Sequence, residues 1–324
     1  MIKTLTIKNF KSIKQLKLNC KRVNLFIGKP NVGKSNILEA VSVFSLPYAY
    51  GNLKDIFRFE NLTNLFHDHD LGEKIEIVAD GFSYGLTFKN GSFKASYEDS
   101  VGKSKSESEF NYDGKLMSGG YSSFVLPSFK LYRFSLMNTF SRSESDFLLP
   151  PRGENLLQIL LIKKELRKFV AGLFSEYNLK LVLKPQEHKI EVQKEIEDVI
   201  IAYPYSLVSD TLQRVVFHFL AIETNRDSIL IFEEPEAHAF PYYTKFLAER
   251  ISLDNSNQYF VSTHNPYFLL SVLEKTSKDD VGIFITYFKD YQTKIKSLTD
   301  KEKTAILDLD AGVFFNLDRF VGEG

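Results

Sequence analysis

The sequence has a single cysteine, Cys20, among its 324 residues. One cysteine excludes a disulfide within the chain and any zinc site built on several cysteines, and it suits a reducing compartment. Long apolar runs are also missing, since none reaches the about 18 residues that a membrane span needs. The N-terminus lacks the pattern of a secretory signal. We therefore expect a cytoplasmic protein with no membrane segment.

The sequence also lacks an excess of positive or negative charge. The 41 Lys and Arg residues balance the 41 Asp and Glu residues, which argues against a surface that coats nucleic acid along its whole length. The first 29 residues are the exception, because they carry eight basic side chains and no acidic one. The eight are Lys3, Lys8, Lys11, Lys14, Lys17, Lys21, Arg22 and Lys29. Two interpretations stay open: the cluster binds a phosphate backbone or a nucleotide, or the lysines lie on the solvent face of strands near a sheet edge.

The stretch Ile27–Ser35, IGKPNVGKS, fits the pattern G-x-x-x-x-G-K-[ST] of a phosphate-binding loop (P-loop). An apolar run at Val23–Ile27 predicts a strand before it, and helical spacing over Asn36–Phe44 predicts a helix after it. The glycines therefore fall at a strand-to-helix turn, where backbone N–H groups and the helix N-terminus attract phosphate. The alternative is a glycine-rich turn that binds nothing.

The pattern assigns a role to each part of the loop. We predict that Lys34 contacts the β- and γ-phosphates of ATP and that Ser35 binds Mg²⁺. The residues expected to contact the nucleotide are Gly28, Pro30, Asn31, Val32, Gly33, Lys34, Ser35 and Asn36.

The first part of the chain predicts mostly antiparallel strands. Three strand-like runs lie between Lys74 and Tyr97, the last two joined by Asn90-Gly91, a strong tight-turn signal. Ser100–Gly120 is rich in Ser, Gly and charge, so we expect a mobile excursion there. Other expected elements are strands at Ile2–Ile7, Gln15–Leu18 and Phe124–Phe134, one long helix at Glu154–Phe174, and short strands from Leu179 to Val192.

The second part alternates helices with apolar strands, which predicts a parallel sheet covered on both faces. The expected helices are Thr211–Glu223, Pro241–Ile251 and Pro266–Glu274, and the strands are Ser228–Phe232, Gln258–Ser262 and Val281–Tyr287. We expect an α/β fold of the P-loop NTPase class: an antiparallel β lobe (1–134), a helical and β insertion (135–205) and a parallel-sheet α/β lobe (206–324). The two lobes are expected to share one core in a single domain.

Two strand ends carry groups suited to phosphoryl transfer. The strand at Ser228–Phe232 runs into Glu233-Glu234-Pro235-Glu236, which places carboxylates at the carboxyl end of a buried strand, where ligands bind in open α/β sheets. We predict that Glu233 supports Mg²⁺ and that Glu234 orients or deprotonates the attacking water. The alternative is that these acids are solvated ends of a strand.

Two further polar positions complete the set. His264, in Val261–Pro266, follows another expected strand and can hydrogen-bond the γ-phosphate, or be a structural histidine. Ser209 stands at the N-cap of the helix that begins near Thr211, and a helix N-terminus attracts anions. Taken alone, Ser209 reads as an ordinary helix cap.

These motifs, in this order, resemble the ABC-type ATPase domain of the OLD family and its RecF-like and SMC-like relatives. Smaller matches are Ile7–Ser12, Pro151–Leu156 and Glu236-Ala237-His238. The resemblance implies that Ser209 binds the γ-phosphate held by an opposite subunit, so that two nucleotides lie between two subunits, and that Lys11 and Ser12 contact the nucleotide. The glycine of the relatives is replaced by Thr211 or is displaced, and Glu233 stands where most relatives have aspartate. Slow turnover is therefore expected.

The resemblance also bears on whether an effector domain is part of this chain. OLD nucleases continue into a metal-dependent TOPRIM domain, whereas this chain reaches only Gly324. The cluster His67-Asp68-His69-Asp70 has adjacent spacing in a polar loop, which disfavours a metal site. Our leading hypothesis is an Mg²⁺-dependent ATPase that dimerises around ATP and controls a separately encoded effector, plausibly in anti-phage defence.

Two rival functions remain at this point. One is a nucleotide-gated scaffold or sensor that scarcely hydrolyses ATP. The other is a DNA-repair ATPase that uses Lys14 and Lys17 on duplex DNA. A P-loop kinase fits less well, because it would not need Glu233, Glu234 and His264 in this order.

Overall fold

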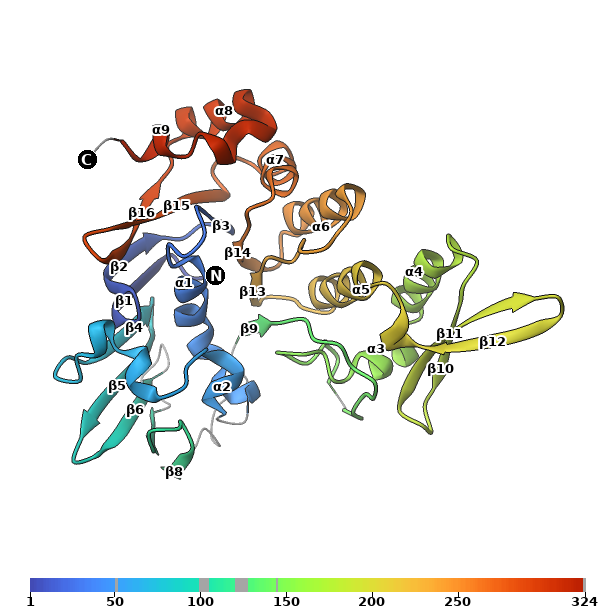
Figure 1. Ribbon diagram of the computed structural model, residues 1–324, viewed down its shortest axis with the longest axis horizontal. Helices are drawn as coiled ribbons and strands as arrows, with labels where there is room; N and C mark the ends of the chain where they lie inside the picture. The colour runs from blue at the N-terminus through green and yellow to red at the C-terminus, as the bar shows by residue number, and fades with distance from the viewer. Residues whose placement is uncertain (50–51, 99–104, 120–127, 144, 323–324) are drawn as a thin grey trace.

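The computed structural model describes residues 1–49, 52–98, 105–119, 128–143 and 145–322 (Figure 1). Within these residues the strands form sheets of six, seven and three strands. Every helix in the described part of the chain is too short or too polar to cross a membrane.

The six-stranded sheet carries the P-loop and is parallel apart from its last pair. Its order is β16-β15-β3-β14-β13-β9, and only β16 runs antiparallel to its neighbour β15. The expected parallel sheet is thus confirmed, and β3, β13 and β14 are the buried, largely apolar runs typical of this arrangement. The strands are β3 (Val23–Ile27), β9 (Phe129–Tyr132), β13 (Ile229–Glu233), β14 (Gln258–Ser262), β15 (Val281–Lys289) and β16 (Gln292–Ser297).

The seven-stranded sheet is an antiparallel meander in the order β2-β1-β4-β5-β6-β7-β8. The turn between β5 and β6 lies at Asn90 and Gly91, both with positive φ (53° and 81°), as the tight-turn signal predicted. The strands are β1 (Thr4–Phe10), β2 (Ile13–Asn19), β4 (Ile75–Ala79), β5 (Phe82–Lys89), β6 (Ser92–Glu98), β7 (Lys105–Phe110) and β8 (Leu116–Gly119).

The expectation of a mobile excursion at Ser100–Gly120 is wrong for the residues that the structure describes there. β7 and β8 extend the meander, and Phe110 is fully buried opposite Phe93. The polar composition misled the prediction because Ser106 and Ser108 are themselves buried on this sheet. Residues 100–104 and 120 lie outside the described residues, as do residues 124–127 of the strand expected at Phe124–Phe134.

Two apolar cores lie on the two faces of the parallel sheet, and one of them contains residues of both lobes. Val23, Leu25 and Ile27 of β3 belong to the core beneath the later helices, whereas Phe26 belongs to the core shared with the antiparallel sheet. This division follows from the alternation of side chains along a strand. The first core is covered by α5 (Asp210–Glu223), α6 (Pro241–Leu253), α7 (Pro266–Lys275) and α8 (Asp300–Leu309), and the second by α1 (Lys34–Ser42) and the meander (Figure 1).

The insertion contains two helices where one was predicted. The break is at Lys163, whose φ and ψ of −93° and 92° are not helical. α3 (Leu156–Ile162) is buried along most of its length, whereas α4 (Lys164–Ser175) buries only one face, so the two helices need different orientations.

The rest of the insertion is a sheet that projects from the body of the molecule (Figure 1). Its strands are β10 (Lys180–Lys184), β11 (Lys189–Ile196) and β12 (Val199–Pro204). The shortest described helices are α2 (Leu53–Ile56), which follows the 3₁₀ helix Val43–Ala49, and α9 (Asp318–Val321), which follows the 3₁₀ helix Asp310–Phe315.

Candidate functional site

Three parallel strands end side by side and bring their following residues to one edge of the sheet. Phe26 of β3 lies opposite Ser262 of β14, and Ser262 lies opposite Glu233 of β13. Two hydrogen bonds continue the alignment past the strand ends: the backbone N–H of Thr263 donates to the carbonyl of Phe26 (3.1 Å), and that of Glu234 donates to the carbonyl of Ser262 (3.0 Å). The P-loop, the Glu233-Glu234 pair and the His264 loop are therefore neighbours.

The P-loop makes a strand-to-helix turn that requires both of its glycines. Gly33 has a φ of 97° and caps α1, and a Cβ there would lie 2.0 Å from Thr293 Oγ1 on β16. A Cβ on Gly28 would lie 2.3 Å from the carbonyl oxygen of Thr286 on β15. The last two strands of the sheet thus press directly on the loop, and only glycine fits at these two positions.

Lys34 is folded back along the loop. Its Nζ donates to the carbonyls of Gly28 and Lys29, each at 2.8 Å, and the residue is only 8% exposed. Burial lowers the pKa of Lys34, and the nearby carboxylates of Glu234 and Glu233 oppose that effect. The lysine and the two carboxylates thus share one electrostatic environment, as a phosphate and metal site requires.

Glu234 and His264 form a pair at this edge. His264 Nδ1 lies 2.9 Å from Glu234 Oε1. Glu234 has a φ of 48°, so the strand has already ended at this residue, before Pro235. Because the backbone of Glu234 is left-handed, its side chain no longer follows the alternating directions of side chains along the strand.

Glu236 lies beneath this pair and links two parts of the site. Thr263 Oγ1 donates to Glu236 Oε1, which ties the turn after β13 to the loop after β14. Burial raises the pKa of Glu236 to about 7, and its Oε2 has no hydrogen-bond partner among the described residues. We infer that Glu236 holds the positions of Glu234 and His264.

The residues predicted to hold Mg²⁺ offer a suitable donor set. Ser35 supplies a hydroxyl and Glu233 a carboxylate, which are the oxygen donors that this cation prefers. The helix α1, which carries Ser35, packs on β13, which carries Glu233. Arg58 joins these two elements, because its guanidinium contacts both Glu39 of α1 and Glu233.

Of Lys11 and Ser12, which the family resemblance assigns to the nucleotide, the structure brings Ser12 to the P-loop. Ser12 Oγ accepts from Asn36 Nδ2 (2.7 Å) and lies 2.6 Å from Thr293 Oγ1, which itself donates to the carbonyl of Val32 (2.9 Å). Lys11 is engaged elsewhere, since its Nζ pairs with Glu39 and donates to the carbonyl of Arg58 (2.7 Å).

Three residues of this region were missed by the sequence analysis: Glu39, Arg58 and Thr293. Glu39 interrupts an apolar run on α1, and such a buried acid was the available signal. Arg58 and Thr293 stand in polar segments whose sequence carries no motif. Their positions depend on the tertiary structure alone.

Ser209 lies apart from the P-loop of its own chain. Its Oγ caps α5 by accepting from the backbone N–H of Leu212 (3.3 Å). It lines an apolar cavity of about 500 Å³ with residues of the insertion and of α6, and no P-loop residue lines that cavity. Thr211, at the position of the expected glycine, donates from Oγ1 to the carbonyl of His238 (2.6 Å).

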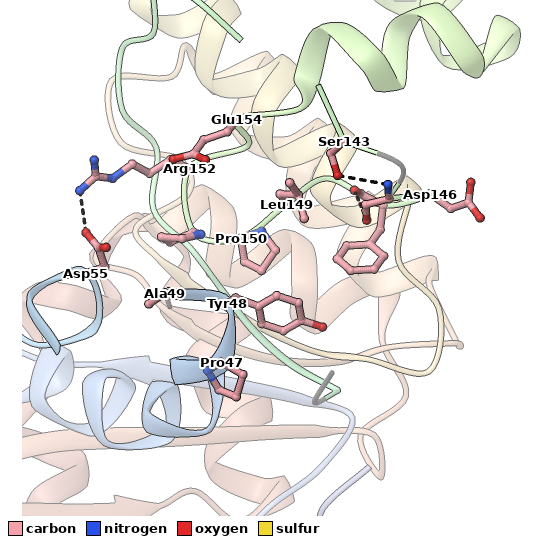
Figure 2. Close-up of a pocket in the computed structure, with 13 residues that line it drawn as sticks. Pro47, Tyr48, Ala49, Asp55, Ser143, Asp146, Leu149, Pro150, Arg152 and Glu154 are labelled. Atoms are coloured by element: carbon pink, nitrogen blue, oxygen red, sulfur yellow. Dashed lines mark hydrogen bonds and ion pairs between the residues drawn. The ribbon is translucent and has the colours of Figure 1, made fainter. Parts of the chain in front are cut away.

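A further cavity, of about 570 Å³, lies between the segment after α1 and the loop that precedes α3 (Figure 2). Pro47, Tyr48 and Pro150 form part of its apolar lining, and the ion pair between Arg152 and Asp55 (2.8 Å) lies at its side. None of the predicted site residues lines it. This cavity is therefore distinct from the candidate nucleotide site.

The basic cluster of the first 29 residues is dispersed in the structure. Lys8 pairs with Glu76 (2.8 Å), Lys29 pairs with Asp318 (2.8 Å), and Arg22 is buried. Lys14 and Lys17 are exposed on β2, an edge strand, which matches the edge-lysine interpretation.

The polar cluster around His67 shows no metal-site geometry. His67 Nδ1 lies 2.8 Å from the carbonyl oxygen of Lys11 and its Nε2 lies 3.4 Å from Asp68 Oδ2. Among the described residues, no three His, Cys, Asp or Glu side chains are grouped to hold a metal ion.

Comparison with known proteins shows a similarity of fold. Residues 1–149 match the family model described as "AAA ATPase domain". The whole chain is similar to the crystal structure of an SMC head bound to the C-winged helix domain of ScpA, with a TM-score of 0.54 and 15% identity over 94% of this chain and 99% of that one. This chain therefore has the fold of an SMC head.

Two other similarities are weaker. The SMC head domain from Thermotoga maritima aligns over 92% of this chain and 99% of that one, with a TM-score of 0.41 and 16% identity. The uncharacterized protein MJECL10 of Methanocaldococcus jannaschii is 51% identical over 45 residues. That alignment spans 14% of this chain and 20% of the length of the relative.

Proposed function

We propose that this ATPase head binds ATP with Mg²⁺ at its P-loop, hydrolyses it slowly, and passes its nucleotide state to a separately encoded partner protein. The observation that carries the proposal is the register of β3, β14 and β13, which places the P-loop, His264 and Glu234 at one edge. Together, the P-loop, His264 and Glu234 are the groups that binding and hydrolysis of ATP require.

The residues have distinct tasks in the proposed reaction. When bound, Mg²⁺ neutralises phosphate charge, with Ser35 and Glu233 as its protein ligands. Lys34 leaves the carbonyls of Gly28 and Lys29 and donates to the phosphates instead. Glu234 orients the attacking water and accepts its proton, and His264 keeps the Glu234 carboxylate in place.

A second copy of the chain would complete the site. The cap of α5 at Ser209 is an anion-attracting helix N-terminus that its own P-loop does not reach. Leu207 and Phe240, near this cap, are 73% and 69% exposed, as expected of a face that another subunit covers. The protein partner is proposed by analogy with the SMC head that binds ScpA, and a role in defence stays a prediction.

Phosphate release by wild type and Glu234→Gln tests the enzymatic part. Removal of a general base is expected to lower the rate by about 10²-fold or more, while ATP binding stays. Glu274→Gln, an exposed glutamate on α7, is the matched control and should keep the wild-type rate. Equal rates in wild type and Glu234→Gln would refute the assignment.

Self-association tests the second copy. Light scattering of Glu234→Gln with ATP and Mg²⁺ is expected to show a dimer that Ser209→Arg abolishes. A monomer under these conditions would contradict the sandwich arrangement.

A further inference from the structure

The carboxylate assigned to the metal already has a cation of this chain beside it. Arg58, which follows α2, places Nη2 3.2 Å from Glu233 Oε1. The Arg58 side chain is 56% exposed and that of Glu233 is 24% exposed. A half-exposed positive charge therefore stands at the carboxylate where a divalent cation is expected.

The same guanidinium binds a second carboxylate on the helix of the P-loop. Arg58 Nε lies 2.6 Å from Glu39 Oε1, and the Glu39 side chain is only 2% exposed. Glu39 is one helical turn beyond Ser35 on α1, so the two residues lie on the same face of the helix. Arg58 thus spans the helix and the strand that supply the two proposed metal ligands.

Glu39 and Glu233 differ in whether another cation would neutralise them if Arg58 moved away. Lys11 pairs with the other oxygen of Glu39 and is 13% exposed, so the buried carboxylate keeps a cation without Arg58. Among the described residues, Arg58 is the only basic side chain with an ion pair to Glu233. A divalent cation can therefore replace Arg58 at Glu233 at little cost in free energy. Glu39 stays neutralised by Lys11.

We propose, as a step that rests on the proposed function, that Arg58 takes the place of the divalent cation at Glu233 and is displaced when that cation binds with the nucleotide. A guanidinium and a divalent cation repel each other, so both cannot occupy one carboxylate closely. Arg58 thereby lowers the affinity of the site for the metal and leaves the metal-free nucleotide affinity unchanged.

The test compares nucleotide affinity with and without metal. A non-hydrolysable ATP analogue is titrated into wild type and Arg58→Gln by calorimetry, once with Mn²⁺ and once with a chelator. The ratio of the two affinities is the coupling between metal and nucleotide. We expect the ratio to rise by about fivefold in Arg58→Gln, the effect of a partly exposed ion pair, with the affinity in chelator unchanged.

Arg152→Gln is the matched control, because Arg152 is a similarly exposed arginine that pairs with Asp55 (2.8 Å) instead (Figure 2). Its ratio should equal that of wild type. A ratio that is unchanged or lower in Arg58→Gln overturns this proposal alone. A wild-type protein that binds no analogue under either condition overturns the proposed function, and this proposal with it.

Discussion

The buried carboxyl of Glu236 predicts an unusual dependence of stability on pH. Burial raises the pKa of Glu236 from its ordinary 4.5 to about 7 in the folded state. The folded protein therefore holds this proton more tightly than the unfolded chain does. The resulting stabilisation is fully present below pH 4.5 and is lost as the pH rises through about 7.

The magnitude follows from the same two values. At about 1.4 kcal/mol per pH unit, the difference between 4.5 and about 7 corresponds to about 3 kcal/mol, most of it lost between pH 5 and pH 8. A glutamine at this position cannot ionise. We compare the free energy of unfolding of Glu236→Gln with that of wild type at each pH. This difference should shift in favour of Glu236→Gln by about 2–3 kcal/mol from pH 5 to pH 8.

Urea unfolding at the two pH values measures this difference, followed by circular dichroism because the chain has no tryptophan. The comparison between pH values removes any constant cost of the amide, such as a buried N–H without a partner. Glu187→Gln, whose side chain is 52% exposed in wild type, is the control and should follow wild type at both values. The reasoning is refuted if Glu236→Gln and wild type lose stability in parallel from pH 5 to pH 8.

Two substitutions in the P-loop give further predictions. Lys34→Ala should lower ATP affinity at least about tenfold in equilibrium dialysis, without loss of fold, because Lys34 donates only to loop carbonyls in this structure; an unchanged affinity would exclude the loop as the phosphate site. Gly33→Ala should lose about 2 kcal/mol or more in urea unfolding, from its φ of 97° and its contact with Thr293, and Thr293→Ala should restore part of that loss. A Gly33→Ala protein as stable as wild type would contradict the geometry of the loop.

The strands of the parallel sheet were predictable from the sequence because burial on both faces leaves a continuous apolar run with sharp ends. β3 and β14 have the predicted boundaries, and β13 differs by one residue at each end. The same sharp ends located Glu234 and His264 at one edge of the sheet. Their roles in catalysis stay predictions, but their proximity is a property of the fold.

Other features depend on contacts between distant segments and left no local pattern. Ser106 and Ser108 have the composition of a loop, and only the pairing of β6 with β7 makes their segment a strand. The helix break at Lys163 arises because α3 and α4 pack on different surfaces. The bridge from Arg58 to Glu39 and Glu233 is of the same kind, because its ends are separated by 19 and 175 positions. Such contacts cannot be derived from spacing in one sequence.

The resting arrangement of the charges supports the proposal that turnover is slow. Lys34 is held by loop carbonyls, Glu233 by Arg58, and Glu234 by His264, so these three groups already have partners in this chain. Nucleotide and metal must replace the first two of these interactions before the water can be activated. The proposed anion site, at Ser209, lines a cavity that no P-loop residue lines. Because the proposed site is completed by a second copy, the reaction should depend on the concentration of the protein as well as on that of ATP.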